Sequence, residues 1–481
     1  MSIPTIELLI DNAAVPGAAL AEVRDPGRFD TVVGRVAQAD AALVGRAVEA
    51  AHRAFPAWAA MPAEERAARV LRFADLLEGI VDELAPVVVA ETGMLPAEIR
   101  MEIAGAAFAA RDNVEAARAF LAPARFEDDG SWVRVEKRPA GVIAGFVPWN
   151  APIVLMVRKL APALVCGNTI VIKTPPTAPL GIGLLLSRAA ALFPPGVVNV
   201  VHGGSEVGQA LVAHPLVRRV SFTGGGAAAS AIMKAAADTV KNVQFELGGN
   251  DPAIVLDDMD LDAQMPALVA GTFHRSGQFC FAVKRIYVPE ALYDAFFDRM
   301  AAEVDTFRIG HPADPRTTFG PVNNAAQYAY VQGLVERARA GAEAVVELGE
   351  PVDPATWSQG YYLRPALVKR PAPDQEIVTC EQFGPVVPVI PYRDEDEAVA
   401  MANATEYGLG SSIWTTDTAR AVALARRLEA GMTFVNRNAQ SRLGRRHMPF
   451  GGVKQSGIGT ENSELGLADY VEYHAINFHK A

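Results

Sequence analysis

Cysteine is scarce in this chain, with three in 481 residues, and no two of them are spaced as CxxC. The histidine motif HExxH is also missing. Structural zinc sites and disulfide frameworks need closely spaced cysteines or histidines, so we expect no metal and no disulfide. An odd cysteine count without such pairs is typical of a reducing compartment, which predicts a cytoplasmic location.

The sequence also lacks long basic runs and long apolar runs. Its formal net charge is -11, which gives a nucleic-acid backbone little attraction. No stretch approaches the roughly 20 consecutive apolar residues of a membrane span. The first residues, MSIPTIELLIDNAAVPG, have neither the basic start nor the apolar core of a signal peptide. We therefore expect no nucleic-acid partner and no membrane partner.

The N-terminal third is rich in alanine, and its pattern predicts helices. After Pro62, the residues Val70, Phe73, Leu77 and Ile80 recur at the spacing of one helix face. We expect a helix there that packs this stripe into a core.

Two segments predict strands outside the main body. Residues 126–140, FEDDGSWVRVEKRPA, combine strand-forming residues with the turn signal DDG, which predicts a protruding hairpin. The tail at 470–478, YVEYHAINF, alternates like an edge strand. Such a strand must pair with another one, for example in a neighbouring subunit.

From Gly141 onward, short β-branched runs alternate with helical stretches; the runs are GVIAGFV, NTIVIK, GVVNVVHG and RRVSFTGG. This alternation predicts an α/β fold with a mostly parallel sheet covered by helices on both faces. A second α/β stretch begins near Asp251, with AIVL and RIYV as strands.

Among the three cysteines, Cys280 is the best candidate for a nucleophile. Cys166 lies in the apolar run PALVCGN, which predicts core packing. Cys380 adjoins Glu381, whose charge disfavours a thiolate. Cys280 follows a glycine turn and has several basic residues close to it in sequence, an environment that favours an activated thiol. The alternative is a buried cysteine that serves only as a small apolar side chain.

Two other residues have the chemistry to assist such a thiol. Glu246 lies between Phe245 and Leu247 in FELGGN, and apolar surroundings raise a carboxyl pKa toward neutrality, as a general base requires. Asn150 follows a strand in GFVPWNAP, where its amide could donate to a developing oxyanion. Each also has a structural interpretation, as a capping or salt-bridged glutamate and as an asparagine that stabilises a proline-flanked turn.

Six short motifs occur in order across nearly the whole chain: PWN, FTGG, FELGGNDP, GQFC, EQFGPV and PFGGVKQSGIG. Together they resemble the aldehyde dehydrogenase superfamily, in its hydrolytic, NAD(P)-dependent branch. The resemblance implies an open Rossmann-like parallel sheet in a dinucleotide-binding domain (residues 1–120 and 140–248) and a second α/β catalytic domain (residues 249–446). It also implies a small β oligomerisation arm and tail strand (residues 121–139 and 467–481) in a homodimer or homotetramer.

The reaction that this resemblance implies is the oxidation of a small-molecule aldehyde to the carboxylic acid. Cys280 would attack the carbonyl carbon to give a hemithioacetal, whose oxyanion the Asn150 amide and the Cys280 backbone N–H would hold. Hydride would pass to NAD or NADP. Glu246 would then activate the water that hydrolyses the resulting thioester.

The resemblance also implies a dinucleotide site at the carboxyl edge of the sheet. Lys173 would bind the adenosine ribose, Glu381 would bind the nicotinamide ribose, and Phe383 would pack against the nicotinamide ring. The remaining cofactor positions are Val147, Pro148, Trp149, Gly204, Leu247, and Gly224 and Gly225, which begin the helix that would face the pyrophosphate.

One departure from the family pattern concerns the cofactor. Pro176 stands where the family often has a glutamate that would repel a 2′-phosphate, so we expect NADP to be tolerated.

Four arginines favour a polar, hydroxylated or carboxylated aldehyde as the substrate. Arg158 takes a position that faces the substrate tunnel in relatives, and Arg275 stands where the cysteine motif commonly has asparagine. Arg442 and Arg446 belong to the loop RNAQSRLGRRHM. Guanidinium groups bind carboxylates well. The alternative is a solvated loop or a contact between subunits.

Three other functions stay open at the level of sequence. A CoA-acylating semialdehyde dehydrogenase would pass the acyl group to CoA, although that branch tends to lack the glutamate at position 246. A catalytically silent structural or binding homologue would share the fold alone. A thiol hydrolase would pair Cys280 with a histidine, and His274 is the nearest one in sequence.

Overall fold

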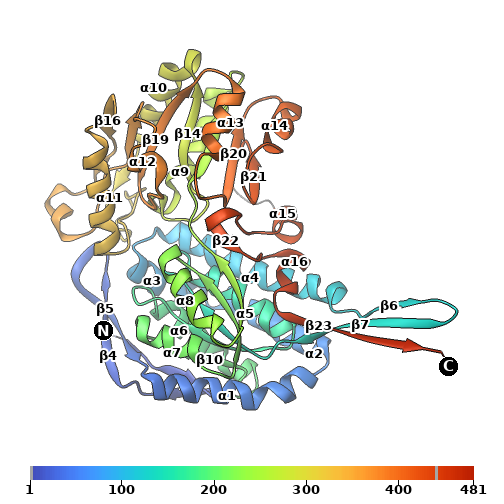
Figure 1. Cartoon of the computed structure of the whole chain (residues 1–481). Helices are drawn as coiled ribbons and strands as arrows, with labels where there is room; N and C mark the ends of the chain where they lie inside the picture. The colour runs from blue at the N-terminus through green and yellow to red at the C-terminus, as the bar shows by residue number, and fades with distance from the viewer. Residues whose placement is uncertain (1–3, 439–441, 481) are drawn as a thin grey trace.

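The computed structural model describes residues 4–438 and 442–480. Its body contains two large sheets with helices packed on them, and an arm extends from one side (Figure 1). The fold is therefore of the α/β, Rossmann-like class that the alternating pattern predicts.

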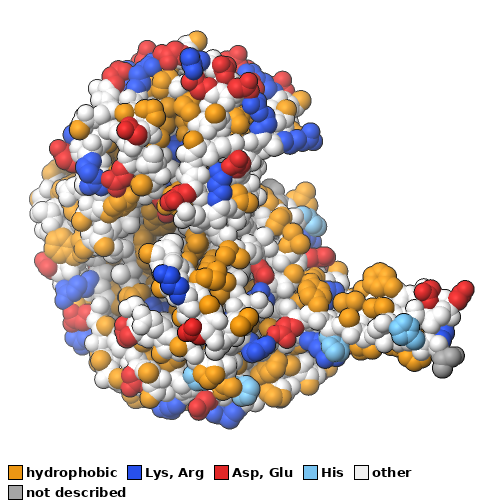
Figure 2. Space-filling model, in the orientation of Figure 1, with side chains coloured by type: hydrophobic (Ala, Val, Ile, Leu, Met, Phe, Trp, Pro, Cys, Tyr) orange, Lys and Arg blue, Asp and Glu red, His pale blue; other side chains and the backbone are white. Residues whose placement is uncertain are grey.

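The arm is the predicted hairpin together with the tail strand. β6 (Ala124–Glu127) and β7 (Ser131–Pro139) form the hairpin, and β23 (Val471–His479) pairs antiparallel with β7 along its whole length. The tail strand therefore has its partner in its own chain. Figure 2 shows that the arm stands clear of the body and carries hydrophobic side chains on its surface.

The first large sheet has eight strands in the order β22-β12-β11-β8-β9-β10-β2-β3. Its central strands are parallel, whereas β22, β2 and β3 join the two ends in antiparallel pairing. The bounds are β8 (Val142–Phe146), β9 (Thr169–Lys173), β10 (Val198–Val201), β11 (Val217–Thr223), β12 (Asn242–Glu246), β2 (Leu8–Ile10), β3 (Ala13–Val15) and β22 (Gly457–Ile458).

The order of these strands creates a crevice at one edge. From β8 the chain adds β9 and β10 on one side, and it then returns to add β11 and β12 on the other side. Such a switch point opens a crevice outside the carboxyl ends of the strands, where ligands of α/β proteins bind. Here the crevice lies between the ends of β8 and β11.

Helices cover both faces of this sheet because its strands are apolar on both sides. Ile143 of β8 packs into one buried cluster, while Val142 and Ala144 pack into another on the opposite face. The helices of the first cluster are α2 (Ala63–Gly79), α3 (Val81–Thr92), α4 (Pro96–Phe120), α5 (Pro152–Val165) and α6 (Leu180–Ala189), and those of the second are α1 (Ala41–Ala60), α7 (Ser205–Ala213) and α8 (Gly226–Ala237).

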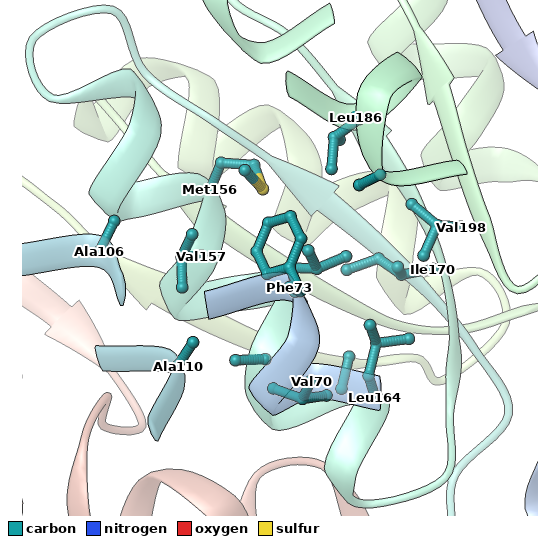
Figure 3. Close-up of a cluster of buried hydrophobic side chains, with 14 of the residues drawn as sticks. Val70, Phe73, Ala106, Ala110, Met156, Val157, Leu164, Ile170, Leu186 and Val198 are labelled. Carbon is teal, nitrogen blue, oxygen red and sulfur yellow. The ribbon is translucent and has the colours of Figure 1, made fainter. Parts of the chain in front are cut away.

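The stripe predicted after Pro62 lies in the first cluster. Helix α2 begins directly after Pro62, and its residues Val70, Phe73 and Leu77 are buried. Figure 3 shows the Phe73 ring within a group of side chains that includes Met156 of α5. The helical prediction for this segment is confirmed.

The expectation of a helical N-terminal third is wrong for its first part. A separate three-stranded sheet stands there, made of β1 (Thr5–Ile6), β4 (Ala19–Asp25) and β5 (Arg28–Gln38). Val23 of β4 and Val36 of β5 are buried together in a small cluster. Burial of these valines in a pleated pair, rather than the alanine content, determines the local structure.

The second large sheet has the order β16-β18-β19-β14-β13-β20-β21 and is parallel except for β16. AIVL and RIYV lie in β13 and β14, as predicted. The bounds are β13 (Asp251–Val255), β14 (Val283–Pro289), β16 (Ala344–Glu347), β18 (Ala366–Lys369), β19 (Val386–Tyr392), β20 (Gly410–Trp414) and β21 (Met432–Val435), and the main helices are α9 (Leu261–Phe273), α10 (Tyr293–Val304), α11 (Ala325–Ala338), α13 (Glu395–Asn403) and α14 (Thr418–Ala425).

The two large sheets meet where the chain passes from one to the other. Glu246 ends β12, and residues 247–250 lead directly into β13. The turn that contains Cys280 precedes β14, so it lies at the amino edge of the second sheet. None of the helices in the described part of the chain has the length and apolar character needed to cross a membrane.

Candidate active site

Cys280 follows a tight turn between α9 and β14 whose backbone is unusual. Arg275 and Ser276 adopt φ values of 54° and 55°, and Gly277 follows at 73°. Left-handed backbone is costly for residues other than glycine and is concentrated at functional sites. A side chain at position 277 would collide with the carbonyl oxygen of Gly384, so this turn requires glycine.

The Cys280 side chain lies where two cavities meet. One has a volume of about 670 Å³ and the other of about 290 Å³, and Asn150, Leu155 and Cys280 line both. Glu246 lines the smaller cavity. The structure thus brings the three predicted catalytic residues to one place, and it leaves the sulfur open to ligands from two directions.

Glu246 is fully buried at the end of β12. Neither of its carboxyl oxygens has a hydrogen-bond partner among the described residues. Burial and, after it, the charge of Glu461 raise the pKa of Glu246 to about 8, while the neighbouring Cys280 thiol acts in the opposite direction. A carboxyl group with this pKa exchanges its proton near neutral pH, as a general base must.

Two buried charges near Glu246 escaped the sequence analysis. The Nζ of Lys159 lies 3.2 Å from Oε1 of Glu461 and donates to the Thr223 hydroxyl at 2.8 Å. Lys159 and Glu461 are 302 positions apart, and no motif connects them. The one available signal was a lysine within the apolar run MVRKLAPAL, because a lysine on a buried helix face needs an acidic partner.

The surroundings of the Cys280 thiol disfavour its thiolate form. Burial and, after it, the charge of Glu246 raise its pKa well above the ordinary value, and Lys284 offsets only part of this shift. The flanking basic residues therefore do not produce a resting thiolate; the guanidinium of Arg275, for example, is paired with Glu102 at 2.8 Å. The thiol must lose its proton as it reacts, and the adjacent Glu246 can accept it.

Asn150 is buried in the segment between β8 and α5, and its amide is held in place. The side-chain Nδ2 donates to the backbone oxygen of Gln278 at 3.1 Å. An amide nitrogen carries two hydrogens, so this bond orients the group and leaves the second hydrogen for an acceptor bound in the cavity.

The smaller cavity contains most of the predicted cofactor positions. Trp149 and Phe383 meet there edge to face, with ring centroids 5.5 Å apart. The predicted residues in its lining are Pro148, Trp149, Gly224, Gly225, Leu247, Glu381 and Phe383.

The residues around this cavity fit a dinucleotide. Gly225 caps the N-terminus of α8 without a side-chain hydrogen bond, and open space surrounds positions 225 and 226. Uncapped N–H groups and the helix dipole favour a phosphate there. Glu381, which accepts from the Gly249 N–H at 3.1 Å and lies 3.4 Å from the Lys284 ammonium, is a carboxylate of the kind that binds ribose hydroxyls.

The other predicted cofactor positions lie outside the lining of this cavity. Val147 follows β8 and donates its N–H to the backbone oxygen of Lys173, at the end of β9. Burial lowers the pKa of Lys173 to about 8, and the charge of Glu206 opposes this shift. Glu206, in α7, accepts from the Gly204 N–H at 3.0 Å. A carboxylate is therefore present near Lys173 although position 176 is an exposed proline.

The larger cavity contains three of the four predicted substrate arginines, and the side chain of the fourth, Arg442, lies outside the described residues. Each of the three is close to a carboxylate, which compensates the charges of Arg275 and Arg446, whereas the carboxylate near Arg158 is shared with Lys159. The pairs are Arg158 with Glu461 at 3.8 Å, Arg275 with Glu102 at 2.8 Å, and Arg446 with Asp112 at 3.2 Å.

Sequence reasoning did not single out Arg437, which also lines the larger cavity. Within the described ranges it has no carboxylate partner. Its only signal in the sequence was its place at the start of the arginine-rich loop.

His274 does not pair with Cys280. Its Nδ1 lies 3.1 Å from Oε1 of Glu98, and no hydrogen bond joins the imidazole to the thiol in the part of the chain that the structure describes. The Cys–His hydrolase hypothesis therefore lacks its base.

Comparisons with known proteins cover nearly the whole chain. Residues 15–476 match the aldehyde dehydrogenase family model. The chain is 36% identical over 446 residues to the glutarate-semialdehyde dehydrogenase of Pseudomonas aeruginosa, and the matched residues cover 92% of this chain and 90% of that protein. A solved structure of an E. coli NADP-dependent enzyme matches with a TM-score of 0.94 and 31% identity over 99% of both chains. Staphylococcus aureus betaine aldehyde dehydrogenase, solved in complex with NAD+, matches with a TM-score of 0.93 and 29% identity over 98% of this chain and 94% of that chain.

Replacement of Glu461 by glutamine removes a negative charge that raises the pKa of Glu246. Because a general base acts in its deprotonated form, turnover in the parent protein should rise as the pH passes about 8. Glu461→Gln should shift this rise to lower pH, which the pH profile of kcat measures. Glu464→Gln removes an exposed glutamate of the same segment and should leave the profile in place. An unshifted profile in Glu461→Gln would show that Glu246 is not the titrating base.

Proposed function

The chain belongs to the aldehyde dehydrogenase family, and we propose that Cys280, Glu246 and Asn150 carry out its NAD(P)-dependent oxidation of aldehydes. The observation that carries the proposal is the meeting of a thiol, a carboxyl and an amide at the junction of two cavities. The aldehyde enters through the larger cavity, and the dinucleotide occupies the smaller one. The Cys280 sulfur can then bond to the carbonyl carbon of the aldehyde, and the dinucleotide lies close enough to that carbon to accept its hydride.

Oxidation begins with covalent capture of the aldehyde. The Cys280 thiol gives its proton to the carboxylate form of Glu246, directly or through a water, and the sulfur attacks the carbonyl carbon to form a hemithioacetal. Asn150 donates its second Nδ2 hydrogen to the oxyanion. One such donor is worth roughly 2.7–4 kcal/mol of barrier in other enzymes.

The second half of the reaction regenerates the thiol. When bound, the dinucleotide accepts the hydride that leaves as the hemithioacetal collapses to a thioester. Glu246 first releases to solvent the proton that it took from Cys280. It then takes a proton from water while the resulting hydroxide attacks the thioester carbon, and the Cys280 thiolate that leaves regains its proton from Glu246 as the acid is released. Aldehyde, water and NAD(P)+ thereby give the acid, NAD(P)H and one proton.

Two alternatives have less support. A CoA-acylating enzyme passes its acyl group to a thiol and needs no carboxyl group to activate water, so Glu246 favours hydrolysis; acyl-CoA formed on addition of CoA would favour the alternative. In a catalytically silent homologue, a fully buried carboxyl without hydrogen-bond partners would cost free energy and bring no benefit.

Two substitutions separate the halves of the reaction. Cys280→Ala should abolish the reduction of cofactor because no sulfur remains to attack. Glu246→Gln should release one equivalent of reduced cofactor per site, more slowly than the parent because the acceptor of the thiol proton is lost, and then stall as the thioester because the base for hydrolysis is lost as well. Stopped-flow absorbance of the reduced cofactor measures both, and Cys380→Ser should behave like the parent. Steady turnover of Glu246→Gln at the parent rate would refute the role of Glu246.

The proposal extends to a polar substrate, an aldehyde with a hydroxyl or carboxylate group. Arg437 supports it, since this exposed arginine lines the larger cavity and has no carboxylate partner among the described residues. The relative from Pseudomonas aeruginosa is named for glutarate semialdehyde, a carboxylated aldehyde. The compensated charges of Arg275 and Arg446 make these two arginines weaker candidates for binding the anion, whereas Arg158 shares Glu461 with Lys159 and keeps an uncompensated charge.

An aldehyde panel tests this substrate class, with each compound measured against both cofactors. Arg437→Ala should raise the KM for a carboxylated aldehyde and leave the KM for an apolar one unchanged, because only the carboxylated aldehyde has a charge that the guanidinium can bind. Arg426→Ala removes an exposed arginine at the end of α14 that forms no ion pair among the described residues, and it is the matched control. Equal effects of Arg437→Ala on both aldehydes would exclude anion binding. Position 176 adds no carboxylate to that of Glu206 near Lys173, so NADP should be used as well as NAD, and a strong preference for NAD would contradict this.

The arm supports a homo-oligomer, a dimer or a tetramer. Phe126, Tyr473 and Phe478 of this small sheet are 64%, 58% and 45% exposed, and exposed apolar side chains on a projecting sheet favour association. Three free cysteines support the reducing, cytoplasmic location expected from the sequence.

Substitution of the arm residues tests this association. The double variant Phe126→Ser with Tyr473→Ser should lower the particle mass measured by light scattering because it removes apolar contact area between subunits. Leu20→Ser changes an equally exposed hydrophobic residue, at 60%, in a different sheet and should leave the mass unchanged. An unchanged mass in the arm variant would place the interface elsewhere.

A further inference from the structure

The guanidinium of Arg275 is buried between the cysteine turn and the segment that carries Asn150. It is 8% exposed. Its Nη1 donates to the backbone oxygen of Asn150 at 2.7 Å and lies 2.8 Å from Oε2 of Glu102. One side chain thus connects the turn before Cys280 to the residue that offers the oxyanion donor.

Glu102 extends this connection to helix α5. Its Oε1 accepts from the backbone N–H of Ile153 at 2.7 Å and of Val154 at 3.1 Å. The N-cap residue of α5, Ala151, provides no side-chain cap, so a carboxylate from α4 satisfies the first N–H groups instead. Glu102 therefore fixes the helix that begins just after Asn150 and is the counter-ion of Arg275.

Asn150 is held to the cysteine turn at both of its polar ends. Its backbone oxygen accepts from Arg275, and its side-chain Nδ2 donates to the backbone oxygen of Gln278. Two bonds in opposite directions between the same two segments determine both the place of the residue and the rotation of its amide. The hydrogen of Nδ2 that remains is the one available to a substrate oxyanion.

The backbone of Arg275 explains how its side chain reaches this place. The residue has φ 54°, and its N–H donates to Oε1 of Glu98 at 2.9 Å. A guanidinium presents several donors in one plane and can contact a carboxylate and a carbonyl together, whereas an ammonium is a single point charge. A buried arginine without its carboxylate would be strongly destabilising, so Glu102 makes this arrangement possible.

We propose that Arg275 is a positioning residue for the oxyanion donor, and that the Arg275–Glu102 pair holds the Asn150 amide at the distance from Cys280 that the first covalent step requires. The inference rests on the proposed function, in which that step forms the hemithioacetal. Arg275 acts through Asn150 and takes no direct part in the reaction of the thiol or in hydride transfer. It does not line the smaller cavity, where the dinucleotide would bind.

A double-mutant cycle tests the proposal. The single variants Arg275→Gln and Asn150→Ala and the double variant are compared by the rate constant of the first burst of reduced cofactor. Arg275→Gln should slow the burst by on the order of 10- to 100-fold, as expected when a reacting group is displaced by about 1 Å, with the KM for the dinucleotide unchanged. In the Asn150→Ala background the same change should have no further effect.

Three outcomes would overturn it. Arg275→Gln could leave the burst unchanged, it could slow the burst by the same factor with and without Asn150, or it could raise the KM for the dinucleotide without slowing the burst. Arg188→Gln breaks an exposed ion pair with Glu83 and is the control for loss of an arginine.

Arg275→Lys keeps the proposal testable if the glutamine variant does not fold. Lysine retains a charge beside Glu102 but not the planar group, so the burst should still be slower than in the parent, and a full parental rate would count against positioning. A parent protein that oxidises no aldehyde would refute the proposed function itself, and this outcome is distinct from every result of the cycle.

Discussion

The rest of the site follows from one constraint, the contact between the carboxyl end of the first large sheet and the amino end of the second. Because residues 247–250 alone connect β12 to β13, the carboxyl end of one sheet cannot lie far from the amino end of the other. Glu246 is the last residue of the first sheet, and Cys280 stands just before a strand of the second. A carboxyl group and a thiol from different sheets are thereby forced together, and the crevice at the switch point between β8 and β11 opens beside them.

The electrostatics of this contact show a consistent pattern. Buried cations near the site have carboxylate partners: Lys159 with Glu461, Arg275 with Glu102, and Lys284 with Glu381. Such pairing compensates the cost of removing charge from water. Glu246 differs, because its oxygens have no hydrogen-bond partner in the described chain and its pKa is raised to about 8. Asp251 shares these features, with a pKa raised to about 7, but it does not line the cavities that meet at Cys280. Glu246 lines the smaller one, so it is the carboxyl group that can exchange a proton with the reacting groups.

The sequence predicted the parts of the site that lie in short motifs and missed those that depend on distant contacts. The parallel strands, the hairpin arm and the tail strand could be read from local periodicity and turn signals, and the motifs around Asn150, Glu246 and Cys280 singled out the residues that the structure brings together. Lys159 and Glu461 were missed because their relation spans 302 positions. The sequence analysis singled out Arg275, but the orientation of its side chain depends on Glu102 in α4. No local pattern connects these two residues. The strands β1, β4 and β5 were missed because the prediction for the N-terminal third gave more weight to its alanine content than to the short alternating patterns at its start.

A crystal structure of the Glu246→Gln variant soaked with an aldehyde and the oxidised dinucleotide tests the central claim most directly, because it captures the intermediate at the meeting point of the two cavities. The account predicts electron density continuous from Sγ of Cys280 into an acyl group, with its oxygen within hydrogen-bonding distance of Nδ2 of Asn150 and the dinucleotide in the smaller cavity. An acyl group on another residue, or an acyl oxygen turned away from Asn150, would contradict it.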